Sequence, residues 1–79
     1  MTHDLKILQP YFDAVMSGDK TFEIRRNDRE YSVGDSLLLR EWSERDGFSG
    51  RQITADVTFL LNGGQFGIAC GHCVMAIRV

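Results

Sequence analysis

The feature that most constrains the fold is a regular alternation of apolar and polar side chains between Gln52 and Leu61. Every second position in this segment is apolar: Ile53, Ala55, Val57, Phe59 and Leu61. Successive side chains of a β-strand point to opposite faces, so the pattern predicts a strand with one buried face. A single strand cannot bury that face alone, and the chain must therefore build a sheet.

Shorter apolar segments predict the other strands of that sheet. They lie at Leu5 to Ile7, Phe22 to Arg25, Leu37 to Trp42 and Val74 to Val79, and the last is expected to be largely buried with the chain ending inside the sheet. The polar segment from Ser43 to Gly50 predicts a hairpin tip or a mobile lid between two strands. All of these strands are short.

One helix is predicted near the N-terminus. Pro10 is suited to a first helical turn, and Gly18 is suited to a helix end. Apolar residues recur with helical spacing at Leu8, Tyr11, Phe12 and Val15. The chain has 79 residues, which predicts a single domain over residues 1–79. We expect an α+β fold: a curled or closed antiparallel β-barrel of about five to six short strands with one N-terminal helix.

Composition excludes several classes of protein. The formal net charge is -2, so a site for a polyanion must be a local patch. No apolar run approaches the roughly 20 residues that span a bilayer, and the first ten residues lack the features of a secretory signal. Two cysteines are too few for a disulfide framework. These observations predict a cytoplasmic protein with no membrane partner.

A local basic patch lies just after the predicted helix. Four of the nine basic residues fall between Gly18 and Arg29: Lys20, Arg25, Arg26 and Arg29. Glu23 and Arg25 share one strand face, and Lys20 is close enough in sequence to join them. An amine, a guanidinium and a carboxylate suit a base-sized polar ligand. The alternative is a solvated strand face on which Glu23 and Arg25 form a surface salt bridge of about 0–1 kcal/mol.

The segment from Gly18 to Arg25 resembles the G-x-K-x-x-E-x-R signature of the ASCH domains, which have a PUA-like β-barrel fold. The resemblance extends from His3 to Trp42, and it includes a V-G-D-x-L-x-L pattern that begins at Val33. The later strands fit the same family. Within it, the chain is most similar to a compact bacterial and phage-associated subfamily whose role is uncharacterised.

This resemblance implies an RNA- or nucleotide-binding domain whose site is a cleft beside the helix. Lys20, Glu23 and Arg25 match the family motif, and Arg26, Asn27 and Arg29 are expected to extend the surface toward a phosphate backbone. No cofactor and no metal are expected. The domain is expected to be a monomer or a weak oligomer.

Two other functions stay open. Some relatives are small amidohydrolases that act on acetylcytidine, so hydrolysis of a modified nucleoside or of RNA has Lys20 and Glu23 as candidate catalytic residues. Here, however, Glu23 stands where those relatives have a threonine, and a carboxylate beside Lys20 favours the unreactive ammonium. The third possibility is a protein-interaction module that uses the loop from Arg45 to Arg51.

A Cys-Gly-His-Cys segment from Cys70 to Cys73 has the spacing of a redox pair or of half a zinc site. It leads directly into the last predicted strand instead of a helix, which favours ordinary structural thiols. His3 is a further candidate for the site. Tyr31 and Trp42 are either stacking surfaces for a base or parts of the core.

Overall fold

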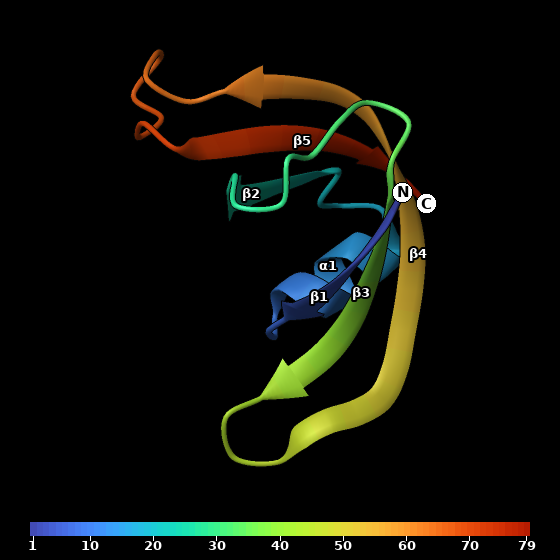
Figure 1. The fold of residues 1–79 in the computed structure, drawn as a ribbon. Helices are drawn as coiled ribbons and strands as arrows, with labels where there is room; N and C mark the ends of the chain where they lie inside the picture. The colour runs from blue at the N-terminus through green and yellow to red at the C-terminus, as the bar shows by residue number, and fades with distance from the viewer.

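Five strands form one curled sheet in the order β1-β3-β4-β5-β2, as the computed structural model of residues 1–79 shows (Figure 1). The strands are β1 (Thr2–Ile7), β2 (Phe22–Arg26), β3 (Ser36–Ser43), β4 (Gly47–Asn62) and β5 (His72–Arg78). One helix, α1 (Tyr11–Ser17), lies on the concave side of the sheet. The predicted α+β class, with a curled, barrel-like sheet and one N-terminal helix, is confirmed.

The long, bent strand β4 joins the two halves of the sheet (Figure 1). Its first part pairs with β3 and its last part with β5, and Asp56 is in register with Ser36 on one side and Arg78 on the other. The strand already begins at Gly47, so the loop predicted from Ser43 to Gly50 is wrong in length. Only residues 44–46 form the turn.

The predicted alternation in this strand is correct only as far as Val57. A register shift, typical of a β-bulge, lies between Val57 and Phe59. Ala55 and Val57 are buried, but Phe59 is 64% exposed and Leu60 packs against the core instead. One inserted residue moves every later side chain to the other face, and this is why the prediction fails for Phe59.

The sheet is not wholly antiparallel, contrary to the prediction. β1 runs parallel to β3, with His3 beside Leu37 and Leu5 beside Leu39. A parallel pair needs a long crossover connection, and here α1 and β2 lie in that connection. β1 and β2 stand at the two ends of the strand order and form the free edges of the sheet.

The helix buries only half of its predicted apolar stripe. Phe12 and Val15 are buried, whereas Tyr11 and Leu8, which precedes the helix, are about half exposed. Gly18 ends the helix in the left-handed conformation, with φ of 84°, as its position in the sequence predicts. The helix has seven residues, and no helix of the structure is long and apolar enough to cross a membrane.

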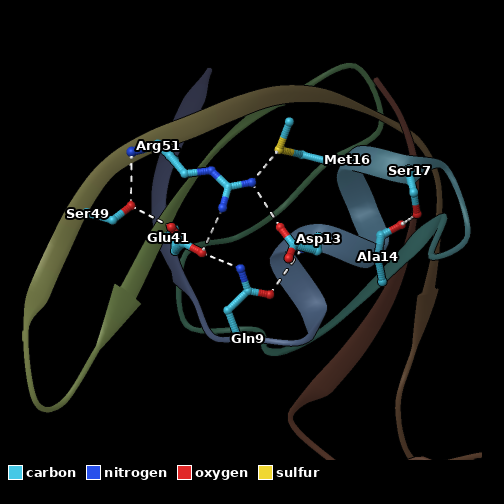
Figure 2. A network of polar contacts seen from close by, with 8 residues as sticks. All are labelled: Gln9, Asp13, Ala14, Met16, Ser17, Glu41, Ser49 and Arg51. Atoms are coloured by element: carbon cyan, nitrogen blue, oxygen red, sulfur yellow. Dashed lines mark hydrogen bonds and ion pairs between the residues drawn. The ribbon is translucent and has the colours of Figure 1, made fainter.

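A polar network holds α1 against the β3–β4 hairpin (Figure 2). Arg51 Nη2 donates to Asp13 Oδ1 over 2.9 Å, and the guanidinium lies 4.9 Å from the ring centre of Phe12. The Glu41 carboxylate accepts hydrogen bonds from Gln9 and, over 2.6 Å, from Ser49 Oγ. These contacts set the position of the helix relative to the sheet.

The apolar core lies between α1 and the concave face of the sheet. Its buried members are Leu5, Ile7, Phe12, Val15, Tyr31, Leu37, Leu39, Ala55, Val57, Cys73, Met75 and Ile77. The last strand alternates, with Cys73, Met75 and Ile77 inside. Val79 lies beyond the strand and is exposed, so the prediction that the chain ends inside the sheet is wrong.

Candidate functional site

Three side chains from the motif meet on the inward side of β2. The Glu23 carboxylate is only 3% exposed. Lys20 Nζ donates to Glu23 Oε1 and to the Phe22 carbonyl, the latter over 2.7 Å. Arg25 Nε donates to Glu23 Oε2 over 2.9 Å. The amine, the acid and the guanidinium therefore converge, and the alternative of a solvated strand face is wrong because Glu23 is buried.

The chain reversal after α1 places Lys20 beside the strand. Gly18 turns the backbone at the helix end, and the Lys20 N–H then donates to the Ala14 carbonyl over 2.9 Å. This bond ties the start of β2 to the helix. Glu23 is in register with the buried Met75 of β5, so its side chain points inward while Ile24, its neighbour, is 57% exposed.

Arg25 also links the two free edges of the sheet. Its Nη2 donates to the Lys6 carbonyl of β1 over 2.8 Å, and Arg29 Nη1 donates to the Asp4 carbonyl over 2.8 Å. Side-chain donors thus satisfy backbone carbonyls of β1 that no strand covers. The sheet is closed here by guanidinium groups instead of a backbone ladder.

A cleft of about 670 Å³ lies beside these three groups. Its lining comes from the end of β1, the helix and β2: Lys6, Ile7, Leu8, Tyr11, Ala14, Asp19, Lys20, Phe22, Glu23, Ile24 and Arg25. The Lys20 ammonium is 5.0 Å from the ring centre of Phe22 and 5.9 Å from that of Tyr11. Apolar walls with a few convergent polar groups are typical of sites for small ligands.

A second hollow of about 170 Å³ adjoins the cleft, since Arg25 lines both. Arg26 and Arg29 lie in its lining, together with Leu5, Asp28 and Tyr31. Asn27 lines neither hollow: its Oδ1 accepts a hydrogen bond from the Tyr31 N–H over 3.2 Å. The structure thus brings Arg26 and Arg29 near the motif and uses Asn27 in a turn.

His3 does not line the cleft. It is buried, its ring meets that of Tyr31 edge-on at 4.7 Å, and its Nε2 lies 2.8 Å from Asp35 Oδ2. Tyr31 belongs to the core, and burial raises the pKa of its hydroxyl. Trp42 lies elsewhere, with the Lys6 ammonium 4.4 Å from its ring centre. None of the three is placed to stack on a ligand in the cleft.

The two cysteines have different surroundings. Cys73 is fully buried in the core and Cys70 is exposed, and both are free thiols. Burial raises the pKa of the Cys73 thiol, which disfavours the thiolate that redox chemistry needs. No three His, Cys, Asp or Glu side chains are grouped as ligands for a metal ion. The geometry agrees with structural thiols.

The apolar walls of the cleft were missed by the sequence interpretation. Leu8 and Tyr11 carry the helical spacing of a core stripe, yet both are half exposed at the cleft. Phe22 and Ile24 share one face of β2, and both are exposed. The sequence carried no signal for this, because alternation in a strand does not tell which of its two faces is covered.

The family model described as "Domain of unknown function (DUF3850)" matches residues 2–77, almost the whole chain. The chain belongs to the DUF3850 family. A relative described as an "Uncharacterized 12.9 kDa protein in GpA 3'region" of Escherichia phage P2 is 43% identical over 56 residues. That match covers 71% of this chain and 50% of the phage protein, so this DUF3850 chain corresponds to about half of that relative.

Proposed function

We propose that this domain binds an unpaired nucleotide, free or within single-stranded RNA, in the cleft beside β2. The observation that carries the proposal is the buried Glu23 carboxylate, clamped between Lys20 and Arg25 at the side of an apolar cleft. The remaining donors of the two cations suit phosphate or carbonyl oxygens. The apolar walls suit the faces of a base.

Two aromatic side chains support this assignment. Tyr11 is 52% exposed and Phe22 is 43% exposed, and both line the cleft. An exposed ring beside a cation is the usual platform for a nucleobase, and stacking contributes about 1–3 kcal/mol per base. A purely structural ion pair has no need of exposed rings around it.

The local charge also favours an anionic ligand. Two cationic groups lie at the cleft, Lys20 and Arg25, against the two acids Asp19 and Glu23. Arg26 and Arg29 lie in the adjoining hollow with the single acid Asp28. This side of the domain therefore has more cations than acids although the whole chain carries a net charge of -2, and it suits a path for phosphates.

The geometry supports binding more than hydrolysis. Lys20 donates to both the Glu23 carboxylate and the Phe22 carbonyl. Both bonds engage the amine as a donor, whereas a nucleophilic lysine must present a free lone pair to its substrate. The similarity of this segment to the ASCH signature is a second, independent support for a nucleotide ligand.

The test is direct binding of six-nucleotide RNA homopolymers, labelled with fluorescein and followed by fluorescence polarisation, with unlabelled mononucleotides as competitors. We expect one homopolymer to bind, and binding to weaken between about 50 and 200 mM salt because phosphate contacts release counterions. Competition by mononucleotides distinguishes a single-nucleotide site from a site that needs an RNA chain.

The matched comparison uses two double variants. Lys20→Ala with Arg25→Ala removes two charges from the cleft, and Arg40→Ala with Arg45→Ala removes two charges from residues that line no hollow. We expect the first to lose at least tenfold in affinity and the second to stay within twofold to threefold of the unchanged protein. Circular dichroism checks that each variant is folded. Equal losses in both, or none in the first, contradict the proposal.

A further inference from the structure

We infer that the backbone of Ile24 reads the base, through an N–H and a C=O that are open on the free edge of β2. This inference rests on the proposed function and names the part of the ligand that the cleft recognises. That part is the Watson–Crick edge of an unpaired base, a planar edge with a hydrogen-bond donor next to an acceptor.

The direction of the Ile24 backbone follows from the β2–β5 ladder. The Thr21 carbonyl accepts from the Ile77 N–H, and the Asn27 N–H donates to the Gly71 carbonyl. In an antiparallel pair, residues that bond across the ladder alternate with residues whose N–H and C=O point away. Thr21 and Asn27 both bond to β5, so the odd-numbered residues of β2 face that strand. Ile24 is even-numbered, and its N–H and C=O therefore point to the free edge.

The other backbone groups on this edge are partly occupied. The Phe22 carbonyl accepts from Lys20 Nζ over 2.7 Å, and the Arg26 carbonyl accepts from the Asp28 N–H over 2.9 Å. Ile24 lines the cleft and is the one residue of the edge with both its donor and its acceptor open. The free edge of β2 therefore offers one complete pair of a hydrogen-bond donor and an acceptor.

A single pair suits a planar ring better than a peptide strand. A strand added to a sheet edge needs a row of open N–H and C=O groups. Across the cleft, the β1 carbonyls of Asp4 and Lys6 are already covered by Arg29 and Arg25. A ring that bonds to Ile24 lies near the rings of Tyr11 and Phe22, which also line the cleft.

The decisive variant is Ile24→Pro, which removes the open N–H without removing a ladder hydrogen bond. Proline is tolerated on edge strands for this reason. The matched control is Ile24→Val, which keeps the N–H and has as many side-chain carbons as proline. Against the homopolymer that binds tightest, we expect Ile24→Pro to lose tenfold or more and Ile24→Val to stay within twofold.

A second arm changes the ligand instead of the protein. The same homopolymer is made with a methyl group on the ring nitrogen of the Watson–Crick edge, such as N3-methyluridine for uridine. We expect the unchanged protein to bind the methylated oligomer at least tenfold more weakly. Ile24→Pro keeps the Ile24 carbonyl, so methylation should weaken its binding further, but by a smaller factor than in the unchanged protein, because the two hydrogen bonds to one ring are coupled.

The outcomes separate this inference from the function on which it rests. If Lys20→Ala with Arg25→Ala abolishes binding while Ile24→Pro binds as Ile24→Val does, the backbone contact is wrong and the cleft assignment remains. If neither a homopolymer nor a mononucleotide binds the unchanged protein, both are wrong.

Should Ile24→Pro fail to fold, the unchanged protein is titrated with the oligomer and its amide resonances are followed by NMR. We expect the Ile24 amide proton to move downfield and its hydrogen exchange to slow. An Ile24 amide that does not change while the Lys20 and Arg25 side-chain signals do would overturn the inference.

Discussion

Two polar clusters on either side of α1 use the same kinds of side chain in different ways. The Glu41 cluster draws its partners from distant segments, with Gln9 before the helix and Ser49 and Arg51 on the next strand (Figure 2). The Glu23 cluster draws its partners from its own segment, since Lys20 and Arg25 lie within three residues of it. The first connects the helix to the hairpin, whereas the second lies at the cleft and reaches another strand only through the bond of Arg25 to the Lys6 carbonyl.

The difference matches the proposed division, in which the Glu41 cluster serves the fold and the Glu23 cluster a ligand. Arg51 bridges Glu41 to Asp13 and lies over Phe12, so it connects the hairpin to the helix. Glu23 makes no such connection, yet it is the more deeply buried acid and it lies at a cleft. A buried charge with local partners and an adjacent hollow is better explained by recognition than by stability.

The largest effect is expected for Glu23→Ala. Removing the carboxylate leaves Lys20 and Arg25 partly buried without their common partner, and breaking a buried ion pair costs about 3–5 kcal/mol. Both cations are partly exposed, so we expect a smaller loss of about 2–3 kcal/mol in the free energy of unfolding, measured in urea. Glu41→Ala, at the other cluster, is the comparison: its carboxylate is less deeply buried, so we expect a smaller loss there, and a greater one contradicts the argument from burial.

A smaller effect is expected for Arg51→Ala. Its ion pairs with Asp13 and Glu41 are half exposed, and its cation–π contact with Phe12 adds to them. We expect a loss of about 0.5–1.5 kcal/mol in the free energy of unfolding. RNA binding should stay within twofold. Arg45→Ala, on the hairpin turn, is the control and should change neither quantity; a loss of RNA binding in Arg51→Ala contradicts the division between the clusters.

The smallest effect is a dependence of stability on acid. Hydrogen bonds from Gln9 and then Arg51 hold the pKa of the Asp13 carboxyl below its ordinary value. The hydrogen bond from Ser49 is the main cause that lowers the pKa of Glu41. A lowered pKa in the folded state contributes stability above the ordinary pKa and loses it as the pH falls through the lowered value. We therefore expect the urea midpoint to fall below about pH 4. Arg51→Ala should show a shallower fall, and an equal one contradicts the assignment.

The motif was readable from the sequence because its chemistry is local. Lys20, Glu23 and Arg25 lie within six positions, and strand geometry by itself brings such neighbours together. The strand at Gln52, the helix end at Gly18 and the turn before Ser36 were also local signals. The Glu41 network was not readable, because its hydrogen-bonded partners are up to 38 positions apart.

What the sequence determined by itself was the α+β class, the approximate positions of the strands and the helix, and the meeting of the motif side chains. Each of these depends on neighbours along the chain. The tertiary structure decided which face of β2 is covered, where the β4 register shifts and that β1 runs parallel to β3. Alternation divides side chains between two faces but carries no information about which face meets the core, since that depends on packing between distant segments.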